Sequence, residues 1–555
     1  MLDSENNPNR IRRFNIPKSK HNIVIVGGGT AGSVLASRLS EDPNIFVTLL
    51  EAGPGHEAYD STVLEPINAT DVWTGEGENV VSQAMASRTG SISMIQNRML
   101  GGTSAANGLA TLRGQPADYD SWAEAGLTGW SWEDVKNTFI AAERDIDFGN
   151  TPIHGGEGPL PVRRWRRDEL AHGQAAFFDG MIKGGQPVAT DINDPSQLPG
   201  IGIFPVTIDE QAKRVSTSLA YLTDEVVKRD NIEIRTRAEV AKIEFSNGRA
   251  TGVLLANGEE IEADEIVVTA GAIWTPTMLL RSGVGPKAHL AEYGIKVHAD
   301  LSVGSTMSDH IGTGIPYWHD GPRGGSAGPA QVVLVGASNG KDIDYHVMPV
   351  SIHNPETNPL TFKEKARLLG SGSSPKDNNS KNPSLKTVLS IMKFFATPTS
   401  TATMCMLAVF LLRSSGRGSV RLGNTPEADP KVVAPPLPED APERLRHAFD
   451  QIAIWEQSDA FKAQKLQPIL PHDLSASDAV SVALERNTIS YGHMVGTCPM
   501  GPVLDTDCRV HGIPNLRVAD ASVMPTIPCG NTYLGCVMVA ERIASKMKAE
   551  GKFGK

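Results

Sequence analysis

Residues 23–51, IVIVGGGTAGSVLASRLSEDPNIFVTLLE, decide the fold class of this chain. A compact β-branched run at 23–26 is interrupted by the glycine turn 27–32; apolar residues at helical spacing follow, and a second apolar run occupies 45–50. Strand, turn, helix and strand within so short a stretch form the βαβ unit of a parallel sheet. The sequence therefore predicts an α/β fold.

The turn carries the GxGxxG pattern, made by Gly27, Gly29 and Gly32. The first glycine permits a tight turn, the second lets the backbone approach a pyrophosphate, and the third lets the helix pack closely on the strand. The helix that follows Thr30 and Ala31 presents unpaired N–H groups and the positive end of its dipole to the phosphates. This context predicts a dinucleotide-binding domain of the Rossmann type.

An acidic residue ends the second strand: Glu51 stands nineteen residues after Gly32 and precedes Ala52. Its carboxylate can accept hydrogen bonds from a ribose diol. A 2′-phosphate would bring two anions together there, so NADP is disfavoured. FAD and NAD remain, and the glycines alone do not separate them.

The bulk composition is that of a globular protein with more than one lobe. A chain of 555 residues can bury a large core, and 40% hydrophobic and 21% charged residues are ordinary proportions. The net charge of −11 argues against a nucleic-acid partner, because neutralising phosphates takes a concentrated basic face. The basic cluster Arg163, Arg164, Arg166 and Arg167 is followed at once by two acids, which predicts a solvated surface turn.

Cysteine usage and hydropathy predict a cytoplasmic protein without a membrane span. The N-terminus is polar and has no apolar stretch of the length that a secretory signal needs. The most apolar later segment, 404–412, is nine residues long, far short of the ~20 that cross a bilayer, and predicts a buried strand or helix. No CxxC spacing indicates a metal site, and buried free thiols are expected at Cys405, Cys498, Cys508, Cys529 and Cys536.

Three other segments have a distinct organisation. Residues 1–20 carry no hydrophobic period and predict a loose N-terminal arm. Short strand-like runs from residue 231 to the run ending at 271, separated by Asn-Gly turns, predict a β-meander that returns to the main sheet. Residues 370–384 are rich in Gly, Ser, Asn and Pro, which predicts a mobile loop that is either a lid or a surface excursion.

Three pairs of motifs resemble the glucose-methanol-choline (GMC) family of flavin oxidoreductases. The first pair is NRMLGGTSAANG at 97–108 with RGQPADYDSW at 113–122. The second is GAIWTPTMLLRSGVG at 271–285 with SDH at 308–310, and the third is GHMVGTCPMG at 492–501 with LRVADASVMPTIPCGNT at 516–532. The resemblance runs from about residue 21 to the C-terminus and is weakest between about 313 and 410.

The resemblance implies an α/β fold (α+β overall) with two domains. A Rossmann-like FAD-binding domain is expected from residues 21–162, 206–312 and 488–555. A discontinuous substrate-binding domain, built on an antiparallel sheet, is expected from residues 163–205 and 313–487.

The resemblance also implies which residues hold FAD. Ala106 occupies the position where some members carry a histidine bonded to the flavin, so a noncovalent cofactor is expected. The first motif, residues 97–108, is the family's flavin loop, in which Asn107 and the backbone around Gly102–Ser104 should contact the ring, and Val240 should bracket the adenine. The expected contacts are Gly27, Gly29, Thr30, Ala31, Gly32, Glu51, Ala52, Leu100, Gly102, Thr103, Asn107, Gly108, Val240, Ala270, Gly271, Asp520, Ala521, Asn531 and Thr532.

Two residues are expected to carry the chemistry. Oxidation of an alcohol needs a base near the ring while hydride leaves for flavin N5, and His493 stands at the position of the family's essential histidine. Asn531 stands where the family places a histidine or an asparagine, and should hydrogen-bond the substrate oxygen. Asn531 could instead, or in addition, be the N-cap of the helix 532–548, whose dipole would favour reduction of the ring.

Branch likeness narrows the expected substrate. RGQPADYDSW, AERDIDFG at 142–149 and HGGEGPLPV at 154–162 resemble the 5-hydroxymethylfurfural oxidase and aryl-alcohol oxidase branch, which implies a small or aromatic primary alcohol. The electron acceptor is oxygen or another acceptor such as a quinone, and the oligomeric state is left open. The alternatives are a hydroxynitrile lyase-like enzyme with structural flavin and a non-enzymatic flavin protein. The family's photodecarboxylases are disfavoured because Leu412 replaces their cysteine.

Overall fold

The computed structural model describes residues 20–68, 80–87, 90–320, 328–351, 402–469, 471 and 473–551. The arm predicted at residues 1–20, except for its last residue, and the loop predicted at 370–384 lie outside this part of the chain.

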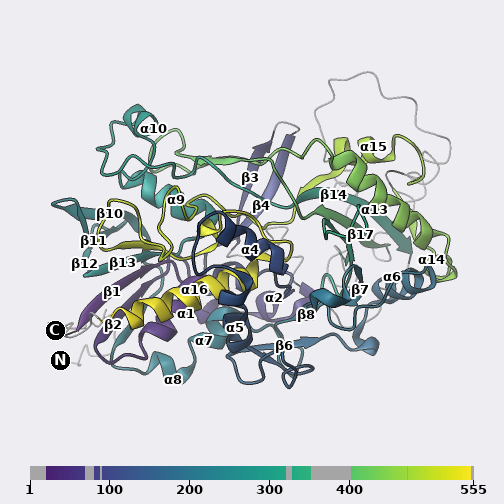
Figure 1. The fold of residues 1–555 in the computed structure, drawn as a ribbon, viewed down its shortest axis with the longest axis horizontal. Helices are drawn as coiled ribbons and strands as arrows, with labels where there is room; N and C mark the ends of the chain where they lie inside the picture. Colours follow the sequence, from purple (N-terminus) through teal and green to yellow (C-terminus); the bar gives the residue numbers. More distant parts are fainter. Residues whose placement is uncertain are drawn as a thin grey trace, which may run out of the picture.

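The predicted βαβ unit begins a five-stranded parallel sheet with the order β22-β13-β1-β2-β9. Strand β1 is completely paired with β2, with Val24 opposite Thr48, because both are short apolar runs buried on both faces. Helices α1 (Thr30–Leu39) and α16 (Thr532–Ala549) pack against each other below the sheet (Figure 1). The strands are β1 (His21–Val26), β2 (Ile45–Leu50), β9 (Ile232–Arg235), β13 (Glu265–Val268) and β22 (Leu516–Val518). The predicted α/β, Rossmann-like architecture is confirmed.

The other large sheet is antiparallel and lies at the opposite end of the molecule (Figure 1). Its order is β20-β14-β17-β16-β15-β7, and β21 also pairs with β14. The apolar run at 404–412 was predicted to be a buried strand or helix, and it forms most of β17, a central strand of this sheet. The strands are β7 (Gly200–Ile203), β14 (Ile311–Asp320), β15 (Val332–Gly336), β16 (Tyr345–Ser351), β17 (Ala402–Leu411), β20 (Gln467–Pro468) and β21 (Thr488–Ser490).

Two buried cores accompany these two sheets, one around the parallel sheet and one around the antiparallel sheet. Strand β21 starts at residue 488, the first residue of the third segment predicted for the FAD-binding domain. It pairs with β14 of the antiparallel sheet, so the two predicted domains share this sheet. The exact domain division stays a prediction. The helices beside the antiparallel sheet are α6 (His172–Lys183), α13 (Ala441–Glu456), α14 (Asp459–Gln464) and α15 (Ala479–Asn487).

Smaller elements surround the parallel sheet. The predicted meander is present in part, as the antiparallel sheet β10-β11-β12, with a turn at Asn247–Gly248 in which both φ angles are positive. Its first predicted run is instead β9 of the parallel sheet, and its last run returns to that sheet as β13, as expected. Its strands, and those of the two other small sheets, are β10 (Val240–Ser246), β11 (Arg249–Leu255), β12 (Glu260–Glu262), β3 (Val80–Ser87), β4 (Gly90–Asn97), β18 (Ser419–Arg421), β19 (Lys431–Val433), β5 (Glu143–Asp145), β6 (Leu160–Arg164) and β8 (Pro205–Val206). The remaining α-helices are α2 (Ser61–Leu64), α4 (Pro116–Glu124), α5 (Trp132–Ala142), α7 (Thr217–Tyr221), α8 (Asp224–Val227), α9 (Gly271–Arg281) and α10 (Lys287–Glu292).

The basic cluster is not the solvated turn that the sequence predicted. Arg163 and Arg164 are buried, because the first is paired with Glu169 and the second with Asp145 and Asp191. Only the last two arginines of the cluster are exposed. Ion pairs therefore compensate both buried charges, with a nearby carboxylate for Arg163 and two carboxylates distant in sequence for Arg164.

A buried charge network connects this cluster to neighbouring segments. The His154 ring lies 2.8 Å from Glu143, 3.1 Å from Asp145 and 2.7 Å from Asp191. Glu143, Asp145 and His154 could hold a metal ion by their spacing. The carboxylates are, however, already bound by Arg113 and Arg164, so the three acids face three cations and the network is neutral when His154 is protonated.

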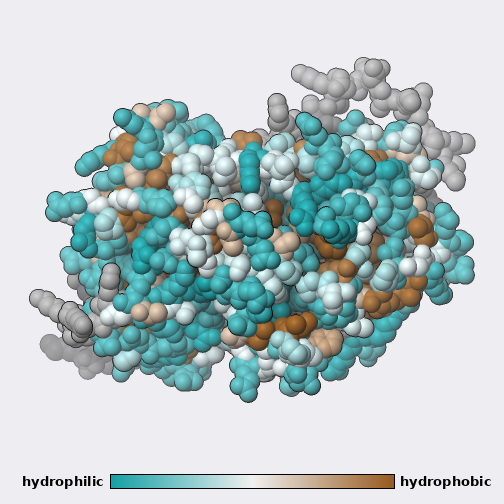
Figure 2. Space-filling model, in the orientation of Figure 1, coloured by the Kyte–Doolittle hydropathy of each residue, from teal (hydrophilic) through white to brown (hydrophobic). Residues whose placement is uncertain are grey.

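The surface is largely polar and the cysteines are buried, as in a globular protein. Figure 2 shows a face that is mostly hydrophilic, with apolar residues in scattered patches. All five cysteines are free and buried, as predicted. Within the described ranges, no helix has both the length and the apolar composition needed to cross a bilayer.

Candidate active site

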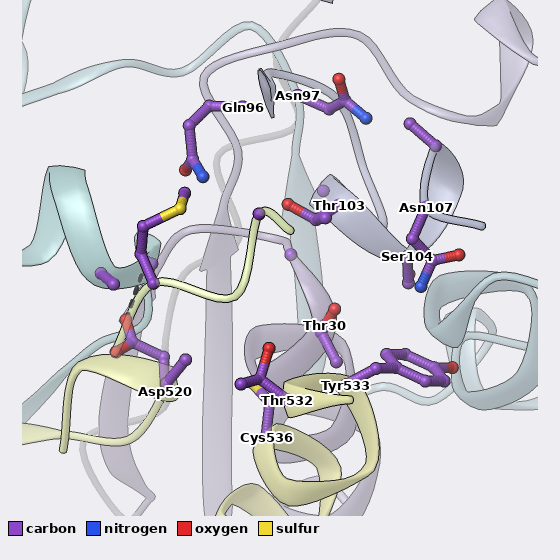
Figure 3. A pocket seen from close by; sticks show the side chains of 18 of the residues that line it. Thr30, Gln96, Asn97, Thr103, Ser104, Asn107, Asp520, Thr532, Tyr533 and Cys536 are labelled. Carbon is purple, nitrogen blue, oxygen red and sulfur yellow. Dashed lines mark hydrogen bonds between the residues drawn. The ribbon is translucent and has the colours of Figure 1, made fainter. Parts of the chain in front are cut away.

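One cavity of about 640 Å³ extends from the parallel sheet to the antiparallel sheet. It touches the glycine turn, the loop after β4, the start of α9, the segment before α16 and the inner face of β16 and β17. Figure 3 shows Thr30, Thr103, Asn107, Asp520 and Thr532 around this space. Residues from five distant parts of the sequence therefore share one binding site.

The first and third glycines of the turn have the conformation and the close packing that the pattern predicts, and the second lies against another glycine. Gly27 has φ +107°, and a side chain there would lie 2.7 Å from the Thr269 carbonyl oxygen. A side chain at Gly32 would overlap the Gly27 carbonyl, so only glycine lets α1 approach β1. Gly29 faces Gly102, where an added Cβ would lie 2.8 Å from the Gly29 Cα. The glycine turn and the flavin loop are therefore packed back to back.

The N-terminus of α1 opens into the cavity. Its N-cap, Gly29, makes no side-chain cap, and the first intrahelical bond runs from Ser33 N to Gly29 O at 3.0 Å. Thr30 and Ala31 line the cavity. The N–H groups of this first turn are therefore placed to bind an anion such as a pyrophosphate.

Glu51 is fixed by backbone donors at one end of the cavity. The N–H groups of Gly28 and Gly53 each donate to one of its carboxylate oxygens at 2.8 Å. Burial raises the pKa of Glu51, and these two hydrogen bonds oppose the rise. Each oxygen keeps a lone pair for a ligand hydroxyl, as a ribose site requires.

The flavin loop forms one wall. Gly101 and Gly102 have positive φ and lead into a short 3-10 turn, Gly102–Ala105. Asn107 Oδ1 accepts hydrogen bonds from Leu109 N at 3.0 Å and from Arg214 Nη1 at 2.9 Å. Both of its donors lie behind the wall, so the Asn107 amide is held at the cavity surface.

Asp520 joins the second and third motifs. Its Oδ2 accepts from Gly271 N at 2.8 Å and from Thr275 Oγ1 at 2.6 Å, while its Oδ1 accepts from Ser522 N at 2.8 Å. The start of α9 and the turn at Ala521 are thereby fixed at the cavity.

The predicted contacts are largely brought together. Gly32 and Leu100 do not line the cavity: Gly32 packs α1 on β1, and Leu100 packs beside Gly28. Every other predicted residue lines it: Gly27, Gly29, Thr30, Ala31, Glu51, Ala52, Gly102, Thr103, Asn107, Gly108, Val240, Ala270, Gly271, His493, Asp520, Ala521, Asn531 and Thr532.

The proposed catalytic pair is in contact. Asn531 Nδ2 lies 3.2 Å from His493 Nε2, and both side chains are buried. Asn531 is the N-cap of α16 by backbone geometry, but its side chain makes no cap hydrogen bond. The capping alternative is therefore wrong, because the amide faces His493 instead. Its Oδ1 is buried without a hydrogen-bond partner among the described residues.

Aromatic rings and a carboxylate hold His493 in place. Tyr491 stacks on its ring at 4.0 Å between centroids, and Phe410 stacks on Tyr491, also at 4.0 Å. Asp309 Oδ1 accepts from the His493 backbone N–H at 2.9 Å, and Ser490 donates to the same carboxylate. The ring has little freedom to rotate.

Burial keeps His493 neutral. Loss of water around the ring, followed by the influence of His346, lowers the pKa of His493 to about 3. An imidazole of this kind is unprotonated at neutral pH and can accept a proton.

His310 is a site residue to which the sequence motifs assigned no role. Its Nδ1 lies 2.9 Å from His493 Nδ1. If His493 donates from Nδ1, its Nε2 lone pair faces the cavity side, next to Asn531. The SDH motif at 308–310 was the available signal, because it contains both Asp309 and His310.

The site fits FAD. The glycine cradle and the open helix end suit a pyrophosphate, Glu51 suits a ribose, and the same cavity continues to a neutral histidine and an orphaned amide oxygen. These features define a nucleotide-dependent oxidoreductase with an acid–base group facing its cofactor site.

Comparisons with known proteins agree with this class. Residues 21–312 and 414–540 match the two family models described as GMC oxidoreductase, so the chain belongs to the GMC oxidoreductase family. It is an FAD-dependent oxidoreductase acting on CH–OH groups. A relative, the oxygen-dependent choline dehydrogenase of Burkholderia multivorans (strain ATCC 17616 / 249), is 30% identical over 95% of this chain and 94% of its own.

Solved structures share the fold. Pyridoxine 4-oxidase from Mesorbium loti superposes with a TM-score of 0.79 at 25% identity, covering 96% of this chain and 99% of that one. A fungal aryl-alcohol oxidase has a TM-score of 0.69 at 22% identity, covering 96% of this chain and 100% of that one.

Proposed function

We propose that this enzyme oxidises a small or aromatic primary alcohol to the aldehyde, with His493 as the base. The observation that carries the proposal is the contact between a buried neutral His493 and Asn531 inside the cavity that also contains the dinucleotide cradle. FAD, when bound, accepts the hydride from the alcohol carbon.

His493 takes the hydroxyl proton at Nε2. Its low pKa keeps that atom unprotonated before the reaction, and its stacked position leaves one edge directed at the substrate. His310 Nδ1 lies 2.9 Å from His493 Nδ1, and when His310 accepts there, the proton of His493 is on Nδ1 and Nε2 is free to act as the base. Such a base contributes about 10²–10⁴-fold to the rate.

Asn531 donates a hydrogen bond to the oxygen that becomes an alkoxide. A neutral amide stabilises this charge without adding a second proton acceptor. Thr532 begins α16 beside it, so the positive end of that helix dipole also faces the cavity.

The cofactor is held without a covalent bond. Ala106 lines the cavity and carries only a methyl group, which cannot form a bond to the ring. Retention of FAD then depends on the glycine cradle, Glu51 and the backbone donors.

The substrate end of the cavity is apolar, which supports an uncharged substrate. Alternate residues of β16 and β17 face it, because side chains two apart lie on the same face of a strand. The charged residues that line the cavity come from the nucleotide end and its mouth: Glu51, Arg98, Glu239, Arg281, Glu427, Asp429 and Asp520. The apolar lining is Phe204, Ala330, Met348, Val350, Met406, Ala408, Phe410 and Ile489.

A panel of alcohols tests the substrate class. Benzylic and furanic primary alcohols should reduce the bound flavin with a kcat/KM at least about tenfold above that for choline, because no described carboxylate at this end pairs with a quaternary ammonium. If choline reduced the flavin faster than these alcohols, the aromatic residues around Tyr491 would instead be expected to bind its quaternary ammonium group. The acceptor is oxygen or another oxidant such as a quinone, and reoxidation of the reduced enzyme by each of them identifies it.

A further inference from the structure

Arg214 is a buried cation directly behind the flavin loop. Its side chain is 1% exposed and lies just before α7. Nε donates to the Val63 carbonyl at 2.9 Å, and Nη1 donates to Asn107 Oδ1 at 2.9 Å. Nη2 is buried without a hydrogen-bond partner among the described residues.

Arg214 differs from the other buried arginines in having no acidic partner. Among the described residues, its ionisable neighbours are two phenols, Tyr59 and Tyr533, and no carboxylate lies within ion-pair distance. Each of the others contacts an Asp or Glu carboxylate: Arg113, Arg163, Arg164, Arg444 and Arg517. Five buried guanidinium groups are therefore neutralised by carboxylates, whereas Arg214 has no carboxylate partner among the described residues.

An open buried charge is costly unless a bound group compensates it. Burial lowers the pKa of Arg214 to about 10, which is still far above neutral, so the guanidinium stays charged. A buried ion without a counter-ion costs several kcal/mol in general. The missing negative charge is thus expected from outside the chain.

Asn107 connects the Arg214 guanidinium to the cavity. Its Oδ1 is occupied by Arg214 Nη1 and Leu109 N, so its amide nitrogen points away from both donors. Asn107, Ser104 and Tyr533, which surround the guanidinium, all line the cavity, and Figure 3 shows them along one side of it. Arg214 therefore lies one layer of residues behind the cavity surface.

We propose that Arg214 is the positive charge that stabilises the reduced flavin. Transfer of a hydride breaks the C–H bond of the alcohol and adds two electrons and one proton to the ring, which gains one negative charge, while the hydroxyl proton goes to His493. Arg214 compensates that gain and polarises the Asn107 amide toward the ring. The inference rests on FAD being the group held in the cavity.

Arg214→Gln and Arg214→Lys form a matched pair of variants. Both lose the guanidinium fork and keep a donor, but only the lysine keeps the charge. The measurement is the two-electron midpoint potential of the bound flavin, determined against reference dyes with a chemical reductant. The glutamine variant should disfavour reduction by about tenfold, which corresponds to about 30 mV, and the lysine variant should stay within about threefold of wild type.

Arg444→Gln is the control, because it removes a buried guanidinium that is paired with Asp344 in the antiparallel lobe. Its flavin potential should equal that of wild type. Equal potentials in the glutamine and lysine variants would overturn the proposal. Failure of both variants to retain flavin would also overturn it, since Arg214 would then hold the cofactor rather than tune it. No alcohol is used, so failure of the proposed substrate class leaves the test intact.

Discussion

His493 owes its chemical state to neighbours that no local motif contains. Three imidazoles, His310, His346 and His493, lie within one buried region, and each has its pKa lowered first by burial. Sequence likeness identified His493 because a motif surrounds it. The motifs gave no role to His310 or Arg214. The partners of such residues come from distant parts of the chain, so they are known only once the chain has folded.

His310 should act as a positioning residue. Removing its ring in His310→Ala frees the Nδ1 side of His493, so the rate of flavin reduction should fall about 10²-fold through misplacement of the base. His310→Asn can still accept the hydrogen bond near the former Nδ1 and should restore most of the rate. Stopped-flow reduction of both variants checks this; equal rates in the two would show that His310 only fills space.

The pH dependence of reduction should reflect the low pKa of His493. The base form persists far below the usual histidine pKa of 6.5, so the rate should stay flat from about pH 8 to about pH 5. A tenfold fall per pH unit below 6.5 would contradict this. Burial also raises the pKa of the adjacent Asp309 to about 7, so the profile is repeated in Asp309→Asn to separate the two groups.

At the scale of elements, local sequence pattern predicted the parallel unit, whereas the antiparallel sheet of the second lobe was expected only from the family resemblance. The strand β1, its glycine turn and α1 are encoded within one short stretch, so local pattern suffices. The antiparallel sheet joins strands from residue 200 to residue 490, and such long-range pairing leaves no local period to read. The wall of the substrate cavity therefore appeared only in the structure.

Substitution of Asn531 distinguishes a role in capping α16 from a role in catalysis. Because its side chain does not cap the helix, Asn531→Ala should lower the free energy of unfolding by less than the ~1 kcal/mol of a lost N-cap. Flavin reduction should nevertheless slow by about 10²–10³-fold. Ser131→Ala, which removes a side-chain cap from α5, is the control and should do the reverse. Urea unfolding and stopped-flow reduction measure the two effects; a stability loss in Asn531→Ala equal to that of the control would restore the capping role.

At the scale of the molecule, the buried charge network connects residues that are distant in sequence and that do not line the cavity: Arg113, Glu143, Asp145, His154, Arg164 and Asp191. Burial opposes protonation of His154, but hydrogen bonds to Asp145, Asp191 and Glu143 outweigh it and raise its pKa to about 10. Two arginines predicted to lie at the surface, Arg163 and Arg164, are buried, because Arg163 pairs with the nearby Glu169 and Arg164 pairs with Asp191, which is distant in sequence. Charge alone could not reveal that packing.

His154→Gln should therefore destabilise the whole fold. Removing the cation leaves the acids under-compensated, which costs about 3–5 kcal/mol of unfolding free energy near neutral pH. Since the folded pKa lies above the unfolded 6.5, this contribution is complete below about pH 6.5 and disappears as pH rises through about 10. Urea unfolding across this range measures it, with the exposed pair variant Lys228→Gln as a near-neutral control. A stability difference between wild type and variant that grew with pH would refute the assignment.

The most direct measurement mixes holoenzyme with a benzylic alcohol in the absence of oxygen and follows the flavin absorbance. The account predicts complete bleaching in the wild-type protein and bleaching about 10²–10⁴-fold slower in His493→Ala. The exposed His511→Ala serves as the control and should bleach like wild type. Wild-type protein that stays yellow with every alcohol would point to a non-redox lyase, and unchanged bleaching in His493→Ala would remove the base from its assigned role.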